Sequence, residues 1–411
     1  MAMTPRHFLL LIACVLPTGT GWAFQASADW GDELAPQEGT AAVDSGPAGD
    51  LAWPAPPLRS PPAAVRAVYL NAWVFGGKRF YNLVALADTT EVNAFVIDIK
   101  DDTGYLTYRS SVPTAIEIGA NKQRRARDTR ERLRLLHAKG IYPIARIVVA
   151  KDPLLAQEKM EWSVRHLDGG LWRDRLDFAW VDAYNDSVWI YAADLAEEAI
   201  HMGFSEIQFD YVRFPDEPKK MMESAVFNAR REGETTRNGV ARNLRLLRDR
   251  MHALEVPLTI DVFGMTASTK VDLGIGQVWQ DLVTTADVVL PMVYPSHYYH
   301  SFYGIKYPNS EPYRVVKHAL ADALEKNAEL GVDTEIRPFL QAFTLRKPRY
   351  TPWYIREQIR AAEDLGINSW VLWNARGVYD PRIFRPQESG AAGQRGGGAE
   401  DSGGGEGSGG R

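Results

Sequence analysis

Apolar residues along this chain follow two alternating patterns. Short runs rich in β-branched and aromatic residues are each followed by a longer stretch in which apolar residues repeat every three or four positions. The runs are AVRAVYLNAW (64–73), NAFVIDIK (93–100), IYPIARIVV (141–149), EIQFDYV (206–212), PLTIDVFG (257–264), DVVLPMVY (287–294), IRPFLQAF (336–343) and SWVLWN (369–374). Strands that alternate with helices pair in parallel through crossover connections. The pattern predicts an α/β protein with the architecture of a (β/α)8 TIM barrel.

Two of the intervening stretches show helix signals at both ends. Residues 313–331 place apolar side chains on one face and end at Gly331, which is typical of a helix C-terminus. Residues 351–366 begin with Thr351 as N-cap and Pro352 in the first turn, and Gly366 ends the stretch. A doubly wound open sheet is the alternative fold, but no glycine-rich phosphate loop follows the first strand.

Composition divides the chain into four segments. Residues 1–23 have a basic start and a short apolar run, which predicts a signal peptide. Residues 24–64 are rich in Pro, Ala and Gly and predict a disordered linker. Residues 65–384 are predicted to form one barrel domain with a long loop after the third strand. Residues 385–411 are Gly-rich and predict a disordered tail.

The predicted signal peptide places the protein outside the cytoplasm, either in the periplasm or secreted. Cys14 is the only cysteine of the chain, so no internal disulfide is expected. The sequence around it, LIAC, resembles a bacterial lipobox, and lipidation of Cys14 would anchor the protein to a membrane. Cleavage near Ala23 is preferred because the apolar stretch before Cys14 is short.

Side-chain alternation along the strands directs polar residues into the barrel. Positions that face the helices must be apolar, and Ile207 and Phe209 fit this requirement, as does Tyr211. Gln208, Asp210 and Val212 would then point inward. The same alternation directs Asp98 and Lys100 inward on the second strand and Asp261 and Phe263 inward on the fifth.

Further polar and aromatic candidates lie near the C-terminal ends of the strands, where barrel enzymes keep their active sites. They are Asn71, Trp73, Arg146, Tyr294, Gln341, Trp373 and Asn374. A single inward aspartate is often structural, whereas three on three strands are harder to explain without a function. Like charges held near one another separate their pKa values, which suits acid–base work on a glycosidic bond.

Asp210 and Asp261 are the candidate catalytic pair because their strands are expected to be neighbours. Asp216 and Glu217, just after the fourth strand, rank below Asp261. The long loop after the third strand contains Trp162, Trp172 and Trp180, for which packing against the barrel is favoured over sugar stacking.

The sequence disfavours several other classes of function. A net charge of −5 gives no basic excess for nucleic-acid binding. HxH and HExxH spacings are absent, and His297 and His300 alone are a weak metal set, so neither a metal nor another cofactor is expected. No GxSxG motif indicates a serine nucleophile. The oligomeric state, sugar identity and stereochemical outcome stay open.

Four segments resemble a bacterial family of glycosyl-hydrolase-like barrel domains. They are NAFVIDIKDDTG, EIQFDYVRFP, LTIDVFG and ADVVLPMVYPSHY, and the resemblance spans about Val65 to Asp380. It implies a (β/α)8 fold and a polysaccharide or oligosaccharide substrate. The PMVYP segment is also similar to the sixth strand of family-18 chitinases. Their acidic run is matched only at Asp210, however, with Val212 in place of the next acid.

Two functions follow as hypotheses. The first is an exported glycoside hydrolase that cleaves a cell-envelope or extracellular polysaccharide, with Asp210 as nucleophile or general base and Asp261 as general acid. The second is a barrel at the cell envelope that binds carbohydrate without cleaving it.

Overall fold

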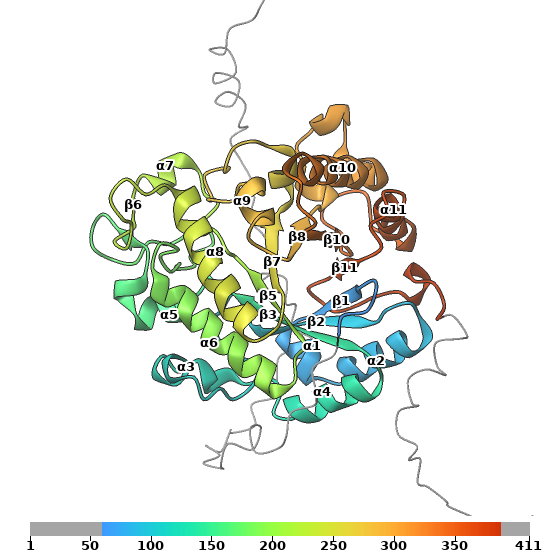
Figure 1. Cartoon of the computed structure of the whole chain (residues 1–411), viewed down its shortest axis with the longest axis horizontal. Coiled ribbons are helices and arrows are strands. Elements are labelled where there is room, and N and C mark those ends of the chain that lie inside the picture. Colours follow the sequence, from blue (N-terminus) through green and yellow to red (C-terminus); the bar gives the residue numbers. More distant parts are fainter. Residues whose placement is uncertain (1–59, 388–411) are drawn as a thin grey trace, which may run out of the picture. The chain divides into compact units, whose positions relative to one another are not determined.

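Eight parallel strands close into a barrel in the computed structural model, which describes residues 60–387. The ring is closed by pairing of the first strand with the last and by a bridge between Phe339 and Met292. The eight strands, which form the central ring in Figure 1, are β1 (Arg66–Leu70), β2 (Ala94–Lys100), β3 (Tyr142–Val148), β5 (Glu206–Asp210), β7 (Leu258–Phe263), β8 (Val288–Met292), β10 (Phe339–Gln341) and β11 (Trp370–Trp373). The predicted (β/α)8 TIM barrel is confirmed, and the open sheet is excluded.

Helices connect successive strands and surround the barrel (Figure 1). The longer ones are α2 (Arg79–Thr89), α4 (Thr129–Ala138), α6 (Asp186–Met202), α8 (Thr236–Ala253), α10 (Pro312–Leu330) and α11 (Pro352–Glu363). Helix α10 matches its sequence prediction and ends at Gly331, whose φ of 65° places it in the left-handed region. Helix α11 begins after Thr351 as predicted, although the Thr351 side chain makes no capping hydrogen bond.

Shorter elements complete the loops at the two ends of the barrel. The short helices are α1 (Ala72–Gly76), α3 (Pro113–Glu117), α5 (Pro153–Glu158), α7 (Lys219–Met222) and α9 (Trp279–Val283). The 3-10 turns are η4 (Ala120–Gln123), η5 (Met160–Trp162), η6 (Gly264–Ser268), η7 (Pro295–His297), η8 (Phe302–Gly304), η9 (Pro308–Ser310) and η10 (Pro381–Ile383). The strand β9 (Glu335–Ile336) precedes β10, and β4 (Arg165–His166) pairs with β6 (Ala225–Val226) as a separate antiparallel ribbon.

Apolar side chains form two separate clusters, one between barrel and helices and one inside the barrel. Ile207 and Phe209 belong to the outer cluster, as the alternation predicts. The inner cluster contains Val96, Ile144 and Leu290, together with aromatic residues nearer the mouth. Because each strand supplies both clusters in turn, its remaining inward positions are free to carry polar groups.

The alternation fails where strands end. Strand β5 stops at Asp210, and Tyr211 takes a φ of 54°, so Val212 packs in the outer cluster rather than pointing inward. Phe263, the last residue of β7, also packs against the outer cluster. The first strand ends at Leu70, three residues earlier than its apolar run, because Asn71 caps helix α1.

The loop after β3 is ordered and packs on the barrel. Trp172 and Trp180 are buried, and their indole groups donate to the Met221 carbonyl and to Asp174. These contacts agree with the packing interpretation that the sequence favours. Pro386 forms an antiparallel β-bridge with Thr90. The folded part of the chain therefore extends at least two residues beyond the predicted domain boundary at residue 384.

The predicted signal peptide 1–23, Cys14, most of the linker 24–64 and most of the tail lie outside the described residues. Within residues 60–387, none of the helices combines the length and apolar character that crossing a membrane requires.

Candidate active site

The strand register brings the predicted polar residues to neighbouring positions in the barrel. Asp98 on β2 lies opposite Arg146 on β3, and Arg146 lies opposite Gln208 on β5. Asp210 is the next inward position on β5, and Asp261 is an inward position of the adjacent strand β7. Adjacent strands are about 4.8 Å apart, so these side chains meet near the C-terminal end of the barrel.

Arg146 is at the centre of this cluster and contacts all three aspartates. Its Nη1 donates to Asp98 Oδ1 at 2.6 Å. Its Nε donates to Asp210 Oδ2 at 3.1 Å, and its Nη2 donates to the same oxygen. Asp261 Oδ2 lies 3.6 Å from Nε. Because Asp210 and Asp261 both approach one nitrogen atom, their carboxylates are close enough to act on a single substrate.

The cluster becomes more buried from Asp210 toward Asp261. The exposed fraction is 5% for Asp210 and 0% for Asp261. Both oxygens of Asp261 accept hydrogen bonds from Gln208 Nε2, at 2.8 and 2.9 Å. Burial, and next the Asp210 charge, raise the pKa of Asp261 well above its usual value. The two carboxylates therefore occupy different electrostatic environments although they are neighbours.

Asp98 has a second partner that the sequence analysis missed. The hydroxyl group of Tyr69 on β1 donates to Asp98 Oδ2, and Arg146 binds the other carboxylate oxygen. Burial is the main cause that raises the pKa of Asp98 to about 6, while Arg146 and Tyr69 oppose it. Tyr69 is two residues before Asn71 and has the same alternation, so the strand pattern could have identified it.

Aromatic rings surround the acids on the β8–β11 side. Tyr294 stacks on Trp373 with ring centroids 6.0 Å apart, and Phe343 contacts Trp373 edge-on at 5.0 Å. Burial, and then the charges of Asp261 and Asp210, raise the pKa of Tyr294 well above its usual value. Trp373 remains partly exposed, so its ring contributes to the surface of the barrel mouth.

Five other candidates from the sequence do not join the acid cluster. Asn71 caps α1 by accepting from Val74 N at 2.8 Å. Trp73 is on that helix, 49% exposed, with the Arg125 guanidinium 3.8 Å from the ring centroid. Gln341 binds Ser296 N and the Phe343 carbonyl, while Asn374 binds the carbonyls of Ala342 and Val378. The hydrogen bonds of Gln341 and Asn374 hold loops at the mouth of the barrel.

Lys100 is the fifth of these residues and is separated from the acids by an irregularity in strand pairing. The register between β2 and β3 shifts between Asp98 and Lys100. As a result, Lys100 Nζ lies 2.7 Å from Asp152, and both side chains are at most 2% exposed. Its ammonium group also approaches the ring of Tyr191 on α6. This position lies toward the helix layer rather than the barrel mouth.

A second buried ionic group lies one level deeper, below Gln208. Glu206 Oε1 accepts from Arg337 Nη1 at 2.7 Å and from Thr259 Oγ1 at 2.9 Å. Glu206 has the same alternation as Gln208 and Asp210, although the sequence analysis did not single it out. Its depth in the barrel indicates a structural role.

Metal binding has no support in the part of the chain that the structure describes. No group of three His, Cys, Asp or Glu side chains there is arranged to hold a metal ion. The three inward aspartates instead surround the Arg146 guanidinium, which occupies the position a cation would need. Glu217 is ion-paired with Arg175, and Asp216 is exposed in the same loop.

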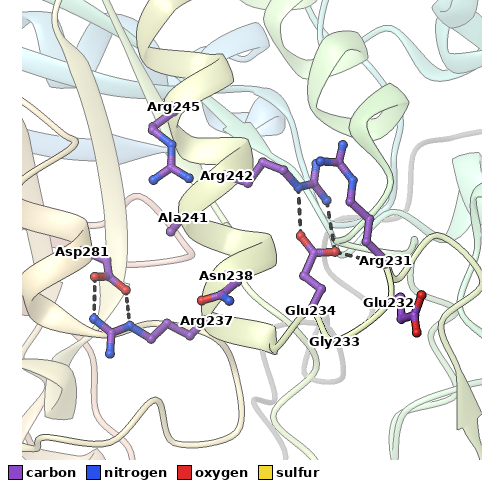
Figure 2. A pocket seen from close by; sticks show the side chains of 10 residues that line it. All are labelled: Arg231, Glu232, Gly233, Glu234, Arg237, Asn238, Ala241, Arg242, Arg245 and Asp281. Carbon is purple, nitrogen blue, oxygen red and sulfur yellow. Dashed lines mark hydrogen bonds and ion pairs between the residues drawn. The ribbon is translucent and has the colours of Figure 1, made fainter.

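A surface hollow of about 570 Å³ lies at the start of α8, and none of the predicted site residues lines it. Figure 2 shows that its arginines are largely paired, Arg237 with Asp281 and Arg242 with Glu234. This hollow does not contribute to the acid cluster.

The chain belongs to a family of barrel domains. Residues 67–379 match the family model described as "Putative glycosyl hydrolase domain". The family predicted by the sequence resemblance is therefore confirmed, and the protein is a member of this glycosyl-hydrolase-like class. No curated protein sequence is similar enough to count as a match.

Several solved structures are similar to this chain. A hypothetical protein from Ruminiclostridium thermocellum ATCC 27405 is 37% identical, with a TM-score of 0.42 over 47% of this chain and 94% of that chain. The α-galactosidase TtGalA from Thermus thermophilus is 14% identical, with a TM-score of 0.47 over 80% of this chain and 61% of that chain. The glycoside hydrolase domain of PelA from Pseudomonas aeruginosa is 12% identical, with a TM-score of 0.43 over 80% of this chain and 98% of that chain.

Proposed function

We propose that this domain is a glycoside hydrolase that cleaves glycosidic bonds of a cell-envelope or extracellular polysaccharide with two carboxylates. The observation that carries the proposal is the contact of one guanidinium, that of Arg146, with both Asp210 and Asp261. Neighbouring carboxylates in different environments are what acid–base cleavage of a glycosidic bond requires. Membership of the glycosyl hydrolase family supports the same reaction class.

Asp210 acts as the nucleophile or general base. It is the more exposed of the two carboxylates and lies at the end of its strand, where a sugar can reach it. Its Oδ2 is held by Arg146, and its Oδ1 accepts from Tyr211 N at 2.5 Å. These bonds fix the carboxylate in one orientation and provide the partners that a buried negative charge needs.

Asp261 acts as the general acid. Its raised pKa favours the protonated form, and a general acid must carry a proton before the bond breaks. As placed in the structure, Gln208 donates to both oxygens of Asp261 and lowers its pKa, an effect that burial outweighs. Gln208 Oε1 is buried without a hydrogen-bond partner within the described residues. A half-turn of the Gln208 amide would let a protonated Asp261 donate to that oxygen.

The surrounding residues position the substrate and balance charge. Asp98, which also accepts from Tyr69, holds Arg146 in place from the β1–β2 side. Burial and the charges of Asp261 and Asp210 keep the Tyr294 hydroxyl group protonated. Trp373 offers a partly exposed ring on which a sugar could stack. Gln341 and Asn374 support the mouth by holding its loops.

Export completes the proposal. The signal peptide expected in residues 1–23 would deliver the barrel outside the cytoplasm, where envelope and extracellular polysaccharides are found. Lipidation at Cys14 is the alternative, and mass spectrometry of the mature N-terminus separates a cleaved chain from a lipidated one.

The direct test is release of new reducing ends from a panel of purified bacterial polysaccharides and cell-wall glycans. Wild-type protein should release them from at least one glycan, and a chelator should leave the rate unchanged. The absence of new reducing ends from every glycan that the protein binds would contradict the hydrolase proposal.

One observation favours the second candidate, a barrel that binds carbohydrate without cleaving it. Asp261 is fully buried in the described structure. The side chains that cover Asp261 must therefore move before it can donate a proton to a bound sugar. Binding to a glycan with unchanged product profile after prolonged incubation would support this candidate instead.

A further inference from the structure

A set of rings and cations borders Asp210 on the side of the loop after β3. We call it the Tyr211 wall; its members are Lys151, Phe178, Trp180, Tyr211 and Arg213. The wall begins at the residue that follows Asp210, and the Tyr211 carbonyl accepts from Ala150 N at 3.2 Å. The wall therefore adjoins Asp210 along the chain. Burial is the main cause that raises the pKa of Tyr211, and the charge of Asp210 also raises it.

Tyr211 has an unusual backbone conformation for its residue type. Its φ of 54° lies in the left-handed region, which a bulky aromatic residue rarely adopts. Such strain tends to occur at functional sites, where surrounding structure enforces it. Here it turns the Tyr211 ring out of the strand and against Trp180, with centroids 5.6 Å apart. The Tyr211 hydroxyl group makes no hydrogen bond within residues 60–387.

Arg213 rests on these two rings. Its guanidinium carbon is 4.9 Å from the Tyr211 centroid and 5.4 Å from the Trp180 centroid. A guanidinium supported by aromatic rings is held in position, and N–H groups at its edge can still bind a planar anion through two parallel hydrogen bonds.

The donors of Arg213 are mostly unused. Among the described residues its only hydrogen bond runs from Nη1 to the Phe214 carbonyl, at 2.9 Å, and no carboxylate is paired with it. This distinguishes it from Arg146 and Arg175, which are both ion-paired. Lys151 adds a second cation behind Tyr211, although Asp102 neutralises it at 2.8 Å.

We infer that the Tyr211 wall is a subsite for a sugar unit that bears a carboxylate. Arg213 binds the carboxylate, and Tyr211 contacts the sugar through its ring and its free hydroxyl group. The inference rests on the proposed function, because it assigns an acidic glycan as the substrate class of the same mouth. A carboxylate fits better than a neutral substituent because only an anion replaces the solvation that the guanidinium loses.

The test measures binding by calorimetry, which does not require hydrolysis. The probes are oligosaccharides of polygalacturonate, alginate and hyaluronan, each compared with its carboxyl-reduced, neutral form. Wild-type protein should bind at least one acidic probe about tenfold or more tightly than its reduced form, as expected for a charge-assisted bond. This preference should weaken as the salt concentration rises.

Arg213→Gln should remove the preference, whereas Arg245→Gln, an equal charge change at an exposed residue of α8, should retain it. Arg213→Lys keeps the charge without the planar fork and should show an intermediate preference. It also provides the comparison if the glutamine variant does not fold. Thermal melts of all variants check that they are folded.

Equal binding of every acidic probe and its reduced form would overturn the inference, as would an unchanged preference in Arg213→Gln. Cleavage of neutral glycans without any acidic preference would refute this subsite and leave the hydrolase proposal standing. A preference for acidic probes without cleavage of any glycan would support this subsite and contradict the hydrolase proposal.

Discussion

Arg146 and Asp210 are joined by two hydrogen bonds to a single carboxylate oxygen across adjacent strands of the barrel. Nε of Arg146 lies 3.1 Å from Asp210 Oδ2, and Nη2 donates to the same atom. The guanidinium is fixed from its other side by Asp98 at 2.6 Å. This relationship answers why a buried strand contains an aspartate: the carboxylate has a cationic partner and still reaches the mouth.

Removal of the Arg146 charge should destabilise the fold. Arg146→Met leaves three buried aspartates without their cation, and breaking a buried ion pair costs about 3–5 kcal/mol. Urea unfolding at pH 7 measures the loss. Arg146→Lys is the control, because it keeps the charge and should lose less. Equal stability of Arg146→Met and the wild type would contradict the central position of this residue.

Asp98 should make stability depend on pH between about 4 and 6. Burial raises the pKa of Asp98 to about 6, so the folded protein binds this proton more tightly than the unfolded chain does. The resulting stabilisation is fully present below the pKa that Asp98 has in the unfolded chain, and it is lost as the pH rises through the folded-state pKa of about 6. Its size is about 3 kcal/mol, from a shift of roughly two pKa units.

Asp98→Asn cannot titrate, so its stability should lack this decline. Urea unfolding of wild type and variant across pH 4 to 7 gives the difference. The raised pKa of Asp182 contributes to both proteins and cancels in the comparison. Asp168→Asn changes a side chain that is 88% exposed and should keep the wild-type profile. Parallel curves for wild type and Asp98→Asn would show that the Asp98 pKa is not raised.

The role of Asp261 as general acid predicts a dependence on the leaving group. Asp261→Asn should slow cleavage of the natural glycan by about 10²- to 10⁴-fold, the usual contribution of general acid catalysis. Cleavage of a nitrophenyl glycoside of the same sugar should fall much less, because its leaving group needs no proton. Steady-state rates on both substrates measure this. Equal losses of rate on the natural glycan and on the nitrophenyl glycoside would instead favour a structural role for Asp261. Asp98→Asn is the control and should affect the two substrates equally.

Lys100 should affect stability without affecting the reaction. Lys100→Met leaves Asp152 buried without its partner and should cost about 3–5 kcal/mol. Lys100→Met/Asp152→Asn should recover part of the loss, since asparagine also serves as an N-cap for α5. The rate per folded molecule should stay at the wild-type value in both variants. A large drop in that rate would place Lys100 in the active site after all.

Strand alternation explains why the sequence could predict most of the acid cluster. Asp98, Arg146, Gln208, Asp210 and Asp261 all occupy inward positions within regular strands, where a period of two is reliable. Tyr69 and Glu206 obey the same rule and were missed only because polar residues nearer the strand ends were preferred.

The sequence could not predict what happens where strands end. Asn71 leaves the alternation because its side chain caps a helix, and Lys100 leaves it because of a register shift. The stacking of Arg213 on Trp180 joins two loops that are distant in sequence, and local patterns carry no signal for such a contact. The structure is needed for both kinds of information.

The most direct test of the catalytic role of Asp210 is the hydrolysis rate of Asp210→Asn on a glycan that the wild type cleaves. Asp216→Asn is the matched control. Asp216 is an exposed carboxylate six residues further along the same connection. Asp210→Asn should lose activity by about 10²-fold or more, while its melting temperature changes little because Arg146 keeps Asp98 and Asp261 as partners. Asp216→Asn should retain the wild-type rate. Full activity in Asp210→Asn would remove this carboxylate from the reaction and contradict the proposed mechanism.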